Sequence, residues 1–119
     1  MLEFYSIDSD DNEVHYLSVY ERQYNTYIFD DKTSEDTKVF FTFGSEFRIK
    51  RVGKISMDFL FDSDRITFGK YENELGLSVV FGIKTKHILF QNNCFLISYE
   101  LYLDEEKISE HNIKIKILD

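Results

Sequence analysis

The sequence predicts an all-β protein: a closed or nearly closed antiparallel barrel of about eight to ten strands. Hydrophobic residues recur at every second position along most of the chain, and short polar segments separate these runs. Composition agrees, because the 119 residues include 12 Phe and 8 Tyr but no proline and no alanine. Aromatic residues favour strands, whereas alanine is the best helix former.

The alternation is clearest in segments 55–62, 77–83, 94–103 and 112–118. In the last of them, Ile113, Ile115 and Ile117 share one face and two lysines lie on the other. A two-residue period of this kind is typical of a strand that is buried on one side only.

Polar turn segments divide the chain at 9–13, 30–37, 52–54, 62–64, 73–76, 91–93 and 104–107. Such short connections favour an up-and-down meander, and closing it into a barrel removes exposed sheet edges. Residues 1–119 are predicted to form one domain. The pattern is weakest over 21–36, where we expect a short helix or a loop.

Charge and cysteine content narrow the function classes. The net charge is −8, and most of the acidic excess lies in residues 1–45. An acidic protein repels phosphate backbones and anionic lipids, so we expect neither a nucleic acid nor a membrane partner. Cys94 is the one cysteine, which favours a reducing compartment. The first sixteen residues lack the basic and apolar regions of a signal peptide, so we expect a cytoplasmic protein.

A resemblance covers residues 27–117. In order, the chain carries YIFDD, FRIKRVGKISM, KY, ELG, GIKTKHI, FLISYELYL and NIKIKI. This succession resembles the YwiB-like family of small bacterial proteins, a family of unknown function. The resemblance implies a calycin-like (lipocalin-like) β-barrel and leaves the activity open, because a fold does not define a function. It supplies no catalytic residues.

Arg51 is the first candidate for a binding residue. It shares the parity of Phe47 and Ile49, which are predicted to face the barrel interior. A buried arginine needs acceptors, because an unpaired buried charge is very unfavourable. It could grip a carboxylate or phosphate of a ligand, or it could bind a carboxylate or strand-end carbonyls of the protein itself.

Four further residues are candidates for the polar end of an interior pocket: Tyr71, Thr85, His87 and Tyr99. A tyrosine on an apolar strand face buries its ring and directs its hydroxyl at a partner, which is either a ligand or another protein group. His87 could carry a proton at neutral pH. The direction of its side chain is ambiguous, because both faces of its strand are equally apolar.

No catalytic residue, metal site or cofactor is predicted. None of the three histidines has a second ligand at metal-binding spacing, and no glycine-rich phosphate loop is present. The run Asp8–Asn12 begins like an EF-hand loop, but Glu13 and Val19 occupy the positions that need Gly and Glu.

Three hypotheses of function follow. The first is a binding module for a small, mostly apolar molecule with an anionic or polar end, which predicts a cavity of ~300 Å³ or larger. The second is an interaction protein or homodimer with a solid core and no ligand, for which Tyr16, Tyr20 and Tyr102 would be exposed contacts. An enzyme ranks last, because it needs convergent groups such as Arg51, Tyr99 and His87.

Overall fold

The computed structural model describes residues 1–119, which form eleven strands. They are β1 (Leu2–Asp8), β2 (Glu13–Ser18), β3 (Tyr20–Gln23), β4 (Thr26–Asp30), β5 (Lys38–Thr42), β6 (Phe47–Val52), β7 (Ser56–Phe61), β8 (Thr67–Glu72), β9 (Ser78–Gln91), β10 (Cys94–Leu103) and β11 (Glu106–Ile117). No helix in it is long and apolar enough to cross a membrane.

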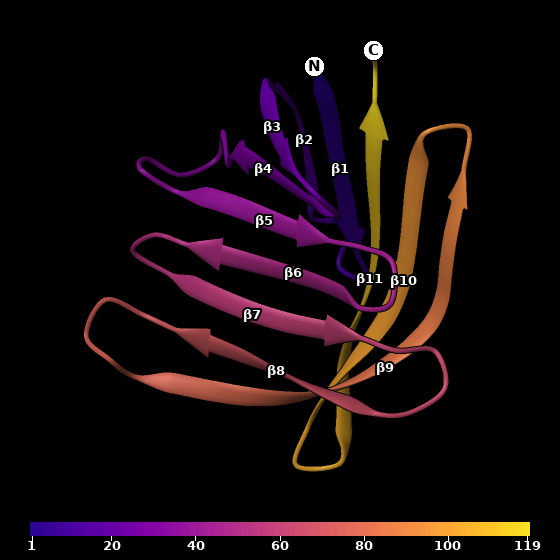
Figure 1. Ribbon diagram of the computed structural model, residues 1–119. Helices are drawn as coiled ribbons and strands as arrows, with labels where there is room; N and C mark the ends of the chain where they lie inside the picture. The colour runs from indigo at the N-terminus through magenta and orange to yellow at the C-terminus, as the bar shows by residue number, and fades with distance from the viewer.

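All eleven strands belong to one antiparallel sheet in the order β2-β1-β11-β10-β9-β8-β7-β6-β5-β4-β3. Strands β3 to β11 form a meander, and β1 then pairs with β11. The two edges of the sheet, β2 and β3, are consecutive in the chain with only Val19 between them. Because the sheet curls so that β5 to β8 lie across β1, β10 and β11, it forms a nearly closed barrel (Figure 1).

The predicted fold class is confirmed, but the strand count is eleven rather than eight to ten. The prediction for residues 21–36 was wrong in part, since β3 and β4 occupy 20–23 and 26–30, and no helix is present. Strand β3 lies at a sheet edge and carries three exposed polar residues, Glu21, Arg22 and Gln23. Its sequence therefore lacks the alternation that marks the other strands.

Aromatic rings fill most of the barrel interior. Phe41 of β5 and Phe95 of β10 meet edge to face at 4.9 Å, although their strands are not neighbours in the sheet. The rings of Phe61 of β7 and Tyr99 of β10 are tilted by 54°, with centroids 4.8 Å apart. Phe29, Phe41 and Phe59 are among the largest fully buried side chains. The end of the barrel that carries Phe41 and Phe95 is therefore solid.

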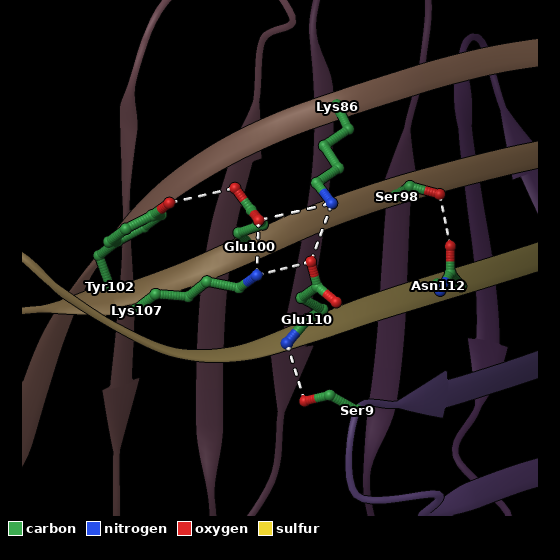
Figure 2. A network of polar contacts seen from close by, with 8 residues as sticks. All are labelled: Ser9, Lys86, Ser98, Glu100, Tyr102, Lys107, Glu110 and Asn112. Atoms are coloured by element: carbon green, nitrogen blue, oxygen red, sulfur yellow. Dashed lines mark hydrogen bonds and ion pairs between the residues drawn. The ribbon is translucent and has the colours of Figure 1, made fainter.

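A second group of side chains binds β9, β10 and β11 together on the outside of the barrel (Figure 2). Lys86 and Lys107 each contact both Glu100 and Glu110, at 2.7–3.4 Å. Hydrogen bonds from the two lysines lower the pKa of Glu110 to about 2. Two acids and two bases balance each other here, which explains how Glu100 is buried without an uncompensated charge.

Candidate ligand-binding cavity

The other end of the barrel is hollow. A cavity of about 230 Å³ lies between β1, β2, β11 and β10 on one side and β5 to β8 on the other. Nine of its 14 lining residues are hydrophobic, among them Val39, Ile49, Met57 and Ile113. The binding hypothesis predicted a cavity of ~300 Å³ or larger, and this prediction was wrong, because the aromatic side chains leave less space. Only a molecule smaller than a typical drug would fit the cavity.

Arg51 faces this cavity from β6, as the alternation of its strand predicts. Its Nε lies 2.6 Å from Oδ2 of Asp31, a residue directly after β4 that is only 8% exposed. The contact has the distance of an ion pair but not the angle of a hydrogen bond. Because a guanidinium carries five N–H donors, most of the hydrogen-bonding capacity of Arg51 remains available to a ligand.

Asp31 is held by its own loop. Its Oδ1 accepts hydrogen bonds from the backbone N–H and the hydroxyl of Thr33. The backbone of Asp31 also donates to Thr37 O at 3.0 Å. These contacts fix the carboxylate at the cavity wall beside Arg51.

Three tyrosines, Tyr16, Tyr71 and Tyr99, form the aromatic part of the lining. Burial raises the pKa of Tyr16 and of Tyr99, so both hydroxyls stay protonated at neutral pH. The hydroxyls of Tyr20 and Tyr102, outside the cavity, instead donate to carboxylates of the protein. No such partner engages the three cavity tyrosines, whose hydroxyls are therefore free to bind a ligand.

His111 of β11 completes the polar lining. Its ring stacks on Tyr99 with centroids 5.0 Å apart and planes 12° apart, and its Nε2 lies 2.8 Å from the hydroxyl of Ser109. Burial lowers the pKa of His111 below its usual value, so the ring is neutral at pH 7. It adds a flat, uncharged surface to the site.

Of the five predicted site residues, the structure brings three together. Arg51, Tyr71 and Tyr99 all line the cavity. Thr85 faces inward and is 5% exposed, but it lies outside the lining and its hydroxyl has no hydrogen-bond partner in the protein. Whether these residues bind a ligand stays a prediction.

The placement of His87 in the barrel interior was wrong. Tyr99 pairs with Thr85, whereas the preceding residue, Ser98, pairs with His87, so β9 has one extra residue at a bulge. A β-bulge shifts the side-chain alternation by one position. Consequently Thr85 is buried and His87 is exposed.

Sequence reasoning missed Asp31, Tyr16 and His111. His111 shares the parity of Ile113, so the alternation of its strand already placed it on the inner face. Tyr16 was predicted to be an exposed contact, but its ring stacks on Phe4 at 5.1 Å inside the barrel. Asp31 lies in a loop, where no periodicity indicates direction.

Comparison with known proteins identifies the family. Residues 8–115 match the family model described as "Domain of unknown function (DUF1934)". The chain belongs to this family. The crystal structure of the ywiB protein from Bacillus subtilis is similar to that of this DUF1934 chain, with a TM-score of 0.66 and 19% sequence identity over 97% of this chain and 88% of the other. That likeness confirms the resemblance drawn from the sequence and shows the fold. No curated protein matches.

The outside of this DUF1934 barrel carries exposed apolar side chains on β8 and β9. Phe68 is 69% exposed. Together with Val80, Gly82 and Ile66, the residue just before β8, it lines one surface pocket. Exposed apolar residues are what a protein partner or a second copy could contact, and this hypothesis stays a prediction. Its premise of a solid core holds at only one end of the barrel.

Proposed function

We propose that the protein is a binding module for a small, mostly apolar molecule whose anionic or polar end contacts Arg51. The observation that carries the proposal is the position of the guanidinium, which forms part of the wall of an otherwise largely apolar cavity. Apolar walls with a few convergent polar groups are typical of small-molecule sites.

The chemistry of the lining supports binding rather than catalysis. Arg51 supplies donors for an anionic group, and the hydroxyls of Tyr71 and Tyr99 can orient it. His87, which the enzymatic hypothesis grouped with Arg51 and Tyr99, lies on the outside of the barrel. The apolar residues then take up the remainder of the ligand.

Replacing Arg51 tests the proposal. We expect 3-phenylpropanoate or 4-methylpentanoate to bind the protein in isothermal titration calorimetry, and Arg51→Gln to weaken the tighter of the two by roughly tenfold to a hundredfold. The reason is that a hydrogen-bonded charge pair contributes about 1.5–3 kcal/mol.

Arg48 offers a matched control on the same strand. It faces the outside of the barrel, where it pairs with Glu46 and Asp58 at 2.7 and 2.6 Å. Arg48→Gln should leave the affinity within about twofold, since exposed ion pairs contribute little. Thermal melting identifies any variant that fails to fold. If Arg51→Gln fails to fold, Arg51→Lys replaces it in the test, because it retains the positive charge. Equal affinity for the wild type, Arg51→Gln and Arg51→Lys would exclude a role of the guanidinium in binding.

A further inference from the structure

The cavity wall presents a cation and an anion side by side. Arg51 Nε and Asp31 Oδ2 are 2.6 Å apart, and both residues belong to the lining. If a ligand has a carboxylate as its only charged group, that carboxylate can contact Arg51 but then lies beside the buried carboxylate of Asp31, which repels it. A ligand with both charges can satisfy both groups.

Asp31 retains room for another donor. An ionised carboxylate offers about four acceptor sites. Two hydrogen bonds, from the N–H and the hydroxyl of Thr33, are accepted by Oδ1. Oδ2 has the ion-pair contact with Nε of Arg51 but accepts no hydrogen bond, so it is open for a donor such as an ammonium group.

Two acidic segments flank the cavity. One is the hairpin between β1 and β2, next to Ser6 and Val14 of the lining, and the other is loop 31–37, which contributes Asp31 and Thr33. Apart from Asp31, which pairs with Arg51 in the cavity, they hold a set of acids that we call the acidic rim: Asp8, Asp10, Asp11, Glu13, Glu35 and Asp36. Lys32 is the one base within these segments.

The acidic rim opposes the approach of molecules with a net negative charge, because like charges repel over about 8–10 Å at moderate ionic strength. It does not oppose a zwitterion. The aromatic walls also accept an ammonium group, since tyrosine faces attract cations. The acidic rim thus disfavours a simple anion, and the Arg51–Asp31 pair in the cavity favours a ligand that carries both charges.

From the paired charges in the cavity and the acidic rim, we infer that the ligand is a small zwitterion of the α-amino acid type. Its carboxylate contacts Arg51, its ammonium group contacts Asp31, and its apolar side chain lies against Met57 and Ile113. This inference rests on the proposed function, because it specifies the ligand of the same cavity.

Two matched sets of probes test the inference by calorimetry: free phenylalanine with 3-phenylpropanoate and 2-phenylethylamine, and free leucine with 4-methylpentanoate and 3-methylbutylamine. Each set removes one charged group from a constant skeleton. We expect the better amino acid to bind at least about tenfold more tightly than its own carboxylate and amine counterparts. Asp31→Asn should then weaken the amino acid at least about tenfold more than it weakens the carboxylate.

Asp30→Asn is the matched control, because Asp30 adjoins Asp31 but lies outside the lining and pairs with Lys38 at 2.7 Å. It should leave the amino acid affinity within about twofold. If a carboxylate binds as tightly as its amino acid, or if Asp31→Asn weakens both alike, the zwitterion inference is wrong and the proposed function stands. If none of the six probes binds, the inference and the proposed function both fail.

Discussion

Phe59→Ala is expected to lower the free energy of unfolding by about 4 kcal/mol, a large share of the roughly 5–15 kcal/mol typical of a domain. Phe59 is 1% exposed. Its ring packs edge to face against Tyr71 and Tyr99, with ring centroids 6.1 and 6.2 Å apart. Removing the ring leaves a space that the curved sheet cannot close, because its strands are held by backbone hydrogen bonds. Equilibrium unfolding in urea measures the effect.

The same ring explains why position 69 is glycine. A Cβ there would overlap Cδ1 of Phe59 and would lie 2.8 Å from Cδ1 of Ile83, the flexible end of that side chain. Gly69→Ala alone should therefore lower stability by about 2 kcal/mol. In the double variant, the added methyl group occupies space vacated by the ring, so the loss should stay near that of Phe59→Ala. Phe68→Ala, at the adjacent exposed phenylalanine, should change stability by less than about 1 kcal/mol. Strictly additive losses in the double variant would contradict this packing.

Asp31→Ala is expected to lower the free energy of unfolding by about 3 kcal/mol, since it leaves the guanidinium of Arg51 without its partner. The loss is placed at the low end for a broken buried pair because the Arg51 side chain is 22% exposed and partly solvated. Adding Arg51→Met should recover about 1–2 kcal/mol of this loss, because it removes the unpaired guanidinium. The hydrogen bonds that Thr33 donates to Asp31 stay lost, so recovery is incomplete. Urea unfolding of the four proteins completes the cycle.

Asp30→Ala provides the comparison for this cycle. Asp30 pairs with Lys38 at the surface, so its replacement should lower stability by less than about 1 kcal/mol. If Asp31→Ala has no larger effect than Asp30→Ala, or if Arg51→Met adds a further loss of its own, the pair does not stabilise this end of the barrel.

The sequence was sufficient for the barrel because nearly every strand repeats the same two-residue pattern. The alternation of β6 also predicted that Arg51 faces inward. Prediction failed where the pattern is interrupted: at the bulge that turns His87 outward, and in β3, whose exposed polar residues show no periodicity. The partner of Arg51 could not be identified, because Asp31 lies in a loop and meets Arg51 only once β4, β5 and β6 are paired.

The sequence did not show whether the barrel is solid or hollow. Large aromatic side chains can meet at the barrel axis and fill it, or they can line the wall of a cavity. In this barrel they do both, because Phe41 and Phe95 fill one end while Tyr16, Tyr71 and Tyr99 surround a cavity at the other. Which end is filled depends on contacts between strands that are not neighbours, and periodicity along a single strand does not report them.

Methyl NMR tests the central claim, binding in the cavity beside Arg51, most directly. The chain has two methionines; Met57 lines the cavity, whereas Met1 is half exposed and ion-pairs with Asp119. In protein labelled with ¹³C at the methionine methyl groups, titration with free phenylalanine or free leucine should shift the Met57 signal progressively to saturation and leave that of Met1 in place. An unchanged Met57 signal at millimolar concentrations of both amino acids and their carboxylate analogues would contradict a binding function for the cavity.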